Sequence, residues 1–158
     1  MDEADFIYTG IPRIENKDQL SVDVFLPLIE KAVKTGRPLL CTNPDMRVYE
    51  GNPPEAVIRQ GSLAEEFSRL GGKVFYIGKP YANAYEAAMI KFPFDRSEVL
   101  MIGDTPETDI RGAKQFGMKA LLLTETGMFA ERIEREGVEA ATAKNKDLPD
   151  YYLGKFNL

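Results

Sequence analysis

The sequence contains no histidine among its 158 residues, and it contains a single cysteine, Cys41. Without histidine, this chain cannot form a Ser-His-Asp or Cys-His catalytic site, nor a zinc or iron site with histidine ligands. One cysteine permits no internal disulfide, which is compatible with a reducing cytoplasm. Because Cys41 lies in an apolar segment, we interpret it as a small core residue. Chemistry in this chain must therefore rest on carboxylates, lysine, hydroxyls and a hard metal ion.

Basic excess and long apolar runs are also missing. The formal net charge of −5 and the pI of about 4.9 argue against a nucleic-acid or anionic-membrane surface, since both need basic patches. No apolar run approaches the ~18 residues of a membrane span, and the acidic first residues lack the pattern of a signal peptide. The apolar fraction of 44% and the charged fraction of 28% predict a soluble globular protein, placed in the cytoplasm.

Strand-like and helix-like patterns alternate along most of the chain, which predicts βαβ units and a parallel sheet. Strands are expected over residues 6–9, 38–42, 74–77, 99–102, 118–123 and 149–153. Helices are expected over 21–35, 62–72, 82–92, 105–117 and 129–136, the second opening with a capping box at Ser62-Leu-Ala-Glu65. The polar segment 43–59 is too long for a plain connector, so we interpret it as an irregular functional loop or lid.

The segment around Asp104 is the most informative one. An apolar run over 99–102 is typical of a strand buried on both faces, and Gly103 and Asp104 follow at its carboxyl end. Thr105 and Pro106 suit the first positions of a helix. Ligands of open α/β sheets bind outside the carboxyl ends of the strands, where Asp104 and Asp109 together can hold a cation such as Mg²⁺. The structural alternative is that both acids are only turn and cap residues.

A second segment shows the same pattern. The apolar run 74–77 ends in Gly78-Lys79-Pro80, which places Lys79 where a ligand crevice is expected. A lysine there can offset the charge of a phosphate beside a carboxylate, although most such lysines are solvated loop residues. We expect Asp104 to end a central parallel strand and Lys79 to end an adjacent one, with both side chains converging on one crevice.

Four segments in this order resemble the haloacid dehalogenase superfamily of phosphatases, and more narrowly its class IIA, which acts on small phosphate esters. They are Thr42-Asn43-Pro44-Asp45, Gly78-Lys79-Pro80, the segment from Gly103-Asp104 to Thr108-Asp109-Ile110, and Gly112-Ala113 before Phe116-Gly117. The resemblance implies an α/β fold: part of a Rossmann-like parallel core, residues 77–158, with part of an α/β cap of the C2 type, residues 1–76.

The resemblance also implies roles for single residues. Lys79 would hold the phosphoryl group together with the nucleophile, and Asp104 would be a direct Mg²⁺ ligand. Asp109 would be the second acid of that motif, orienting a metal-bound water. Asn43 and Asp45 would belong to a cap segment that approaches the substrate, although as a sequence pattern Asn43-Pro44-Asp45 equally predicts a turn.

One motif of the family is absent. The family attacks phosphorus with an aspartate of an early Asp-x-Asp motif, and no such motif stands upstream of Lys79. We therefore expect the carboxyl-terminal part of an Mg²⁺-dependent phosphatase, inactive alone, whose partners are a small phosphorylated metabolite and the missing amino-terminal half. Truncation, proteolysis or a separate chain would each account for the missing half.

Two alternatives come from other classes of protein. The first is a non-catalytic module that binds phosphate or metal, or that dimerises through the cap, and a homodimer is compatible with it. The second, a phospho-acceptor receiver domain, is discarded because such a domain has its lysine after the acceptor aspartate, whereas Lys79 precedes Asp104.

Overall fold

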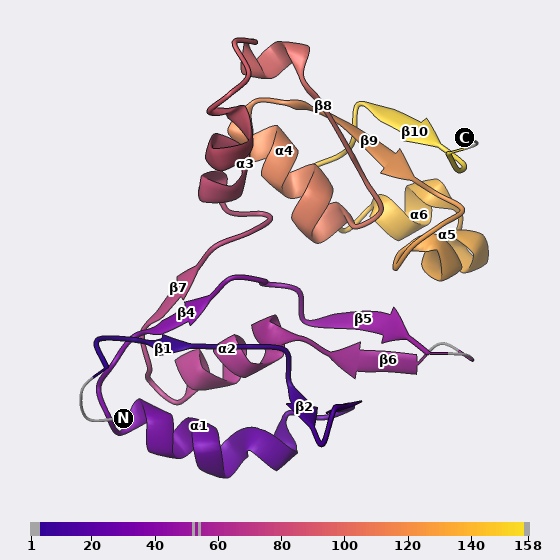
Figure 1. Cartoon of the computed structure of the whole chain (residues 1–158). Coiled ribbons are helices and arrows are strands. Elements are labelled where there is room, and N and C mark those ends of the chain that lie inside the picture. Colours follow the sequence, from indigo (N-terminus) through magenta and orange to yellow (C-terminus); the bar gives the residue numbers. More distant parts are fainter. Residues whose placement is uncertain (1–3, 52, 54, 157–158) are drawn as a thin grey trace. The chain divides into compact units, whose positions relative to one another are not determined.

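The computed structural model describes residues 4–51, 53 and 55–156 of the chain. The chain divides into two compact units, Met1–Gly78 and Lys79–Leu158 (Figure 1). Each unit has its own parallel sheet and its own apolar core, which is the mixed α/β architecture expected from the alternating pattern. Within the described residues, no helix has the length and apolar character that crossing a membrane requires.

The first unit is built on a three-stranded parallel sheet in the order β1-β4-β7. The strands are β1 (Ile7–Tyr8), β4 (Leu39–Cys41) and β7 (Val74–Tyr76), each within two residues of the expected strand ends. The short helix η1 (Asp23–Phe25) leads into α1 (Leu26–Val33), which contacts α2 (Gln60–Arg69). The core of this unit consists of Ile29, Ala32, Leu39, Cys41, Ala64 and Phe67, so Cys41 is the core residue that its apolar surroundings predict.

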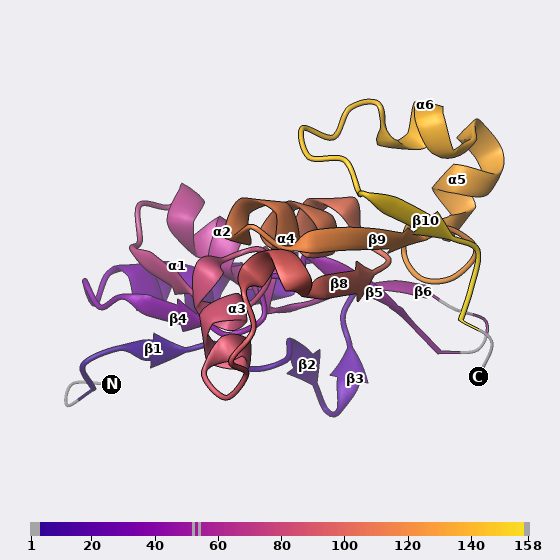
Figure 2. The same cartoon turned by 90° about the horizontal axis from the view of Figure 1, so that it is seen from above.

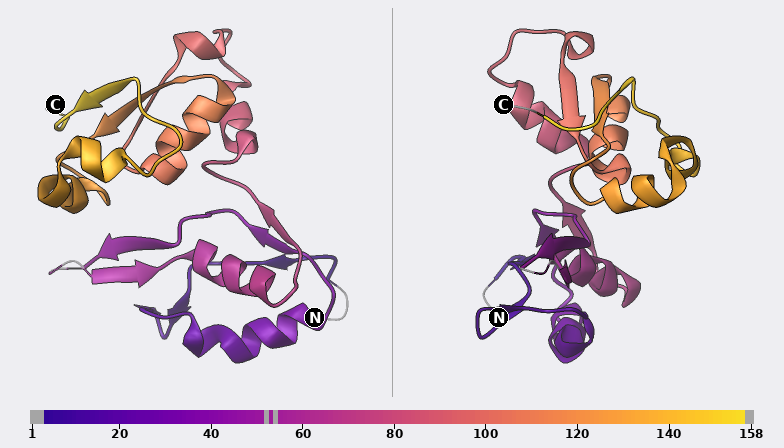
Figure 3. Two further views of the ribbon diagram at one scale, coloured as in Figure 1. Left: turned by 180° about the vertical axis from the view of Figure 1, so that it is seen from behind. Right: turned by 90° about the vertical axis from the view of Figure 1, so that its right-hand side faces the viewer.

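Two antiparallel hairpins complete the first unit. One joins β2 (Arg13–Ile14) to β3 (Lys17–Asp18), and the other joins β5 (Arg47–Glu50) to β6 (Glu55–Ile58) (Figures 2 and 3). The interpretation of 43–59 as an irregular loop was therefore wrong. The buried guanidinium of Arg59 ties the two hairpins together through Asp18, 2.8 Å away, and Glu50, 2.6 Å away.

The capping box at Ser62 was also a wrong prediction. Helix α2 begins at Gln60 with Arg59 as its N-cap, so Ser62 lies inside the first turn. The Ser62 hydroxyl donates to the carbonyl oxygen of Met46, 2.6 Å away, and so holds the start of β5 against the helix. A serine near a helix start can thus serve a tertiary contact instead of a cap.

The second unit holds the other parallel sheet, in the order β10-β9-β8, and Figure 2 shows these strands side by side. Its strands are β8 (Leu100–Gly103), β9 (Lys119–Leu123) and β10 (Tyr151–Leu153). Its helices are α3 (Ala82–Met89), η2 (Arg96–Glu98), the single π-helical turn η3 (Pro106–Ile110), α4 (Arg111–Phe116), α5 (Ala130–Glu136) and α6 (Val138–Thr142). The helix α6 was not expected from the sequence.

The two faces of this sheet differ. Ala120 and Leu122 of β9 are fully buried in a core with residues of α3, α4, α5 and α6. On the opposite face, Ile102 of β8, Leu121 of β9 and Tyr151 of β10 lie side by side in register. Ile102 is 38% exposed and Tyr151 is 52% exposed. One face is therefore packed, and the other is an open apolar surface within the described chain.

The strand order bears on two expectations about β8. The sequence predicted a central strand of the complete core, buried on both faces, with neighbours missing in this chain. Within the described residues β8 is the last strand of its sheet, and Leu100 and Ile102 are exposed. The sequence also placed the strand before Lys79 beside β8, whereas that strand, β7, pairs with β4 in the first unit. Apolar runs look alike at an edge and at a centre, because the pattern carries no record of the neighbouring strand.

Candidate active site

The acidic site is built where β8 ends. Gly103 closes the strand, Asp104 follows, and Pro106 takes the first position of η3 as expected. Proline suits that position because the backbone N–H it lacks would have no partner inside the helix. The turn η3 has π-helical hydrogen bonding: the amide of Ile110 donates to Thr105 and the amide of Arg111 to Pro106, each five residues back. Such turns are rare and occur often at functional sites.

Asp109 folds back from this turn onto the end of β8. Its Oδ2 accepts hydrogen bonds from the backbone amides of Asp104, 3.0 Å away, and Thr105, 3.2 Å away. The residue is only 2% exposed. A Cβ on Gly103 would lie 2.3 Å from the Asp109 carboxylate, so the glycine is what lets the acid approach the strand. Thr105 is the N-cap residue of η3 but makes no side-chain capping hydrogen bond, and Asp109 instead binds the two amides that precede the helix.

Lys79 meets the other oxygen of the same carboxylate. Its Nζ lies 2.6 Å from Asp109 Oδ1, and its side chain is 44% exposed while that of Asp109 is 3% exposed. The ammonium group therefore compensates a buried carboxylate from the solvent side. Lys79 thus contacts Asp109 of the acidic motif, and Asp109 in turn accepts from the backbone amide of Asp104. The convergence of the Lys79 and Asp104 side chains on one crevice stays a prediction.

Asp104 is held by different partners. Its Oδ1 accepts from the Thr105 hydroxyl, 3.1 Å away, and its Oδ2 accepts from the backbone amide of Met128, 3.1 Å away. The loop that carries Met128 reaches Asp104 through Gly127, which has φ +86° and where a Cβ would lie 1.7 Å from Asp104 Oδ2. Two donors fix the direction of the carboxylate, and each oxygen keeps further acceptor capacity.

Sequence reasoning missed the groups that support this site. Tyr85 lies beneath η3, and Gly127 and Met128 come from the loop after β9. Nothing in the sequence pattern distinguishes Tyr85 from an ordinary apolar residue of α3. Burial, with the nearby charge of Asp109, raises the pKa of Tyr85 to about 12, so its hydroxyl stays protonated.

The donor set at Asp104 suits a hard cation. Carboxylate oxygen is the ligand that Mg²⁺ prefers, and Mg²⁺ in proteins is commonly held by one or two carboxylates with the remaining positions taken by water and phosphate. Both oxygens of Asp109 are engaged by Lys79 and the backbone, which suits an outer role for this acid. In the described part of the chain, no group of three or more acidic, histidine or cysteine residues has the geometry of a metal site.

Asn43 and Asp45, predicted to approach a substrate, belong to the first unit. The amide oxygen of Asn43 accepts from the backbone N–H of Asp45, 3.1 Å away, which makes Asn43-Pro44-Asp45 a turn. The carbonyl of Asp45 accepts from Gly61 at the start of α2, 3.0 Å away. The turn geometry matches the structural interpretation of this motif, and a substrate role for the two side chains stays a prediction.

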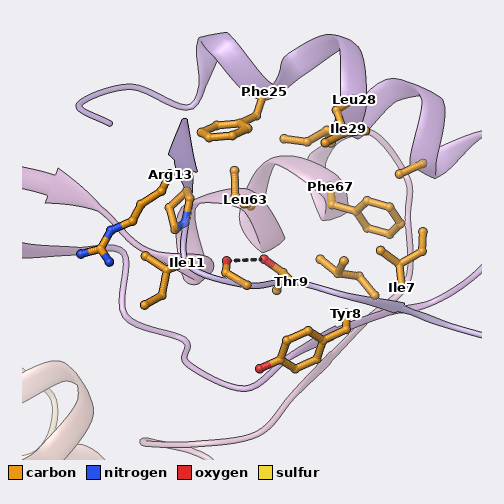
Figure 4. A pocket seen from close by; sticks show the side chains of 14 residues that line it. Ile7, Tyr8, Thr9, Ile11, Arg13, Phe25, Leu28, Ile29, Leu63 and Phe67 are labelled. Carbon is orange, nitrogen blue, oxygen red and sulfur yellow. Dashed lines mark hydrogen bonds between the residues drawn. The ribbon is translucent and has the colours of Figure 1, made fainter. Parts of the chain in front are cut away.

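The first unit also contains an apolar cavity of about 210 Å³ between the β1 segment and α1. Figure 4 shows Phe25, Leu28 and Ile29 on one side and Ile7 and Ile11 on the other. None of the five predicted site residues lines it. The cavity therefore belongs to the packing of the first unit and not to the acidic site.

Comparison with known proteins agrees with the motifs. The family model for HAD-hydrolase-like proteins matches residues 76–153. The chain is 30% identical to the 5'-nucleotidase YutF of Bacillus subtilis over 144 residues, which are 89% of this chain and 52% of that protein. It is 29% identical to the ribonucleotide monophosphatase NagD of Escherichia coli over 120 residues, 75% of this chain and 44% of that protein.

A solved structure extends the similarity to the fold of nearly the whole chain. A haloacid dehalogenase-like hydrolase from Brucella suis superposes with a TM-score of 0.74 at 27% identity, covering 99% of this chain and 57% of that one. The chain belongs to the haloacid dehalogenase superfamily, in its class IIA. It spans about half the length of the curated relatives it matches.

Proposed function

We propose that the chain forms part of an Mg²⁺-dependent phosphatase that hydrolyses a small phosphate monoester. The observation that carries this proposal is the arrangement of Lys79, Asp104 and Asp109 at the end of β8. The phosphatase names of its relatives support the same reaction class. In this proposal the first unit acts as part of the cap and the second as part of the core.

Each residue has a defined task in the proposed reaction. Asp104 would hold the metal ion, whose charge would stabilise the phosphoryl oxygens. Lys79 would neutralise a further phosphoryl oxygen while Asp109 keeps its ammonium group in place. A carboxylate of the missing half would attack phosphorus, and the P–O ester bond would break as the leaving oxygen takes a proton from solvent. Water would then attack the aspartyl-phosphate, releasing inorganic phosphate and restoring the carboxylate.

The need for a second half has its own physical support. An all-parallel sheet is normally covered on both faces, yet the face with Ile102, Leu121 and Tyr151 is open and the edge of β8 lacks a neighbour within the described chain. We propose that the amino-terminal half places a strand beside β8 and apolar side chains over this face. The nucleophile would then stand next to Asp104. A cytoplasmic location is part of the same proposal and rests on the lone buried cysteine.

Turnover of nitrophenyl phosphate tests the proposal. We expect the 158-residue chain with Mg²⁺ to show no turnover above background, and a version extended upstream by a half-domain with an Asp-x-Asp motif to be active. EDTA and Asp104→Asn should each abolish that activity. Robust turnover by the 158-residue chain itself would mean that a nucleophile lies within it, and an inactive, folded extended version would count against the phosphatase function.

A homodimerising, non-catalytic module is the second candidate, and the open apolar face is the observation that favours it. In that case the chain alone would form a discrete dimer whose open face is protected. The extended version would then gain no phosphatase activity.

A further inference from the structure

We infer that Tyr85 is a positioning residue, whose hydroxyl holds the π-helical turn so that Asp109 meets both Lys79 and the end of β8. Tyr85 lies on α3, which begins three residues after Lys79. The hydroxyl donates to the carbonyl oxygens of Thr108, 3.3 Å away, and Asp109, 3.4 Å away. Two residues of the segment from Lys79 to Tyr85 therefore contact Asp109. Lys79 binds its side-chain carboxylate, and Tyr85 donates to its main-chain carbonyl.

The Tyr85 hydroxyl contacts the carbonyls at the end of the π-helical turn. A π-turn shifts the hydrogen-bond ladder by one residue relative to an α-helix. Its carbonyls therefore meet backbone donors in a different pattern, and the Thr108 carbonyl accepts from the Arg111 amide three residues on. The Tyr85 hydroxyl adds a side-chain donor to the carbonyls of Thr108 and Asp109. This added donor favours the turn that directs the Asp109 carboxylate to Lys79 and to the end of β8.

The surroundings of Tyr85 are shaped for this contact. Tyr85 is 5% exposed, and its ring stacks on Phe116 with centroids 5.5 Å apart. A Cβ on Gly112 would lie 2.2 Å from the hydroxyl oxygen, so glycine at that position lets the hydroxyl reach the turn.

Amide exchange measured by NMR on the whole chain tests this inference. The amides of Asp104 and Thr105 donate to Asp109, so they report directly on the position of its carboxylate. In Tyr85→Phe we expect these two amides to exchange roughly three- to tenfold faster, as for the loss of one hydrogen bond, and to shift upfield. The amides of Leu121 and Leu122 in β9 should keep their wild-type rates.

The matched control is Tyr151→Phe, which removes a hydroxyl from an exposed tyrosine of the same unit and should leave all four amides unchanged. Gly112→Ala disturbs the same contact from the opposite side and should reproduce the pattern of Tyr85→Phe. Unchanged Asp104 and Thr105 amides in Tyr85→Phe would overturn the inference. A parallel rise of every amide in the unit would overturn it too, because that result means general destabilisation.

The inference rests on the proposed function in one respect, namely that the position of Asp109 matters for catalysis. The exchange measurement needs no metal, substrate or second half-domain. A failed phosphatase assay and a failed exchange experiment are therefore separate results. If the extended enzyme is active, Tyr85→Phe should lower kcat more than it changes KM, since Asp109 holds Lys79 in place for the phosphoryl oxygens.

Discussion

The Nζ atom of Lys79 lies 2.6 Å from Asp109 Oδ1, although the strands that precede the two residues belong to different sheets. Strand β7 pairs with β4 in the first unit, whereas β8 leads to Asp109 in the second. The ion pair itself lies wholly within the second unit, because the chain passes from one unit to the other between Gly78 and Lys79. The lysine at the beginning of this unit thus forms an ion pair with an aspartate thirty positions further along the chain.

We expect Lys79→Met to weaken phosphate binding and to lower the free energy of unfolding by about 1 kcal/mol. A fully buried pair would cost more to break, but solvent at the exposed Lys79 side chain screens part of the lost attraction. Urea unfolding measures the stability change, and the control is Lys91→Met, a change at an exposed lysine of the same unit. An unchanged free energy of unfolding would show that solvent alone can stabilise the charge of the Asp109 carboxylate.

Gly127→Ala should lower the free energy of unfolding by more than the positive φ of this residue alone would cause. A Cβ at Gly127 would overlap Asp104 Oδ2, whereas at Gly117, a left-handed glycine of the same unit with φ +88°, the nearest atom to a Cβ is 3.9 Å away. Both substitutions carry the backbone cost of about 1–2 kcal/mol for a left-handed residue. We therefore expect thermal or urea unfolding to show an additional loss of about 1–3 kcal/mol for Gly127→Ala. Equal losses in the two variants would mean that the loop moves aside freely.

Stability should fall on acidification through Asp150. The backbone amide of Ala120, with Lys114 and Lys119 nearby, lowers the pKa of Asp150 below its ordinary value of 3.8. A lowered pKa in the folded state gives stability that is present above the unfolded pKa and is lost as the pH falls through the folded pKa. Urea unfolding at pH 6 and pH 3 should therefore show a smaller pH dependence in Asp150→Asn, by less than about 1 kcal/mol because the group is near solvent. The same dependence in both proteins would contradict this role.

The open sheet face should make the isolated chain associate. We expect light scattering after size-exclusion chromatography to show species larger than a monomer, and Ile102→Lys to reduce them because a charge then stands in the middle of the apolar face. Leu148→Lys is the matched control, since Leu148 is exposed in the same unit but lies outside the sheet. A well-behaved wild-type monomer with a cooperative melt would contradict the need for a covering half-domain.

Much of the fold follows from local patterns. Apolar runs of three to six residues and helical periodicity fix the identity of most strands and helices, because each pattern matches one repeat of the backbone. The carboxyl ends of the strands likewise fix Asp104 and Lys79 as candidates before any coordinates are known. The missed elements are short: the β2–β3 hairpin, the β5–β6 hairpin and α6. Segments of two to five residues contain too few positions for periodicity to distinguish them from loops.

What the sequence by itself determined was the chemical inventory: no histidine, one core cysteine, and a lysine and two aspartates next to strand ends. Only the tertiary structure decided how these groups meet. It placed β8 at an edge, turned Asp109 back toward the backbone of Asp104, and brought Tyr85 and the Gly127 loop against the two acids. The reason is that strand order, the π-turn and contacts between distant segments depend on packing in three dimensions, which local residue patterns do not encode.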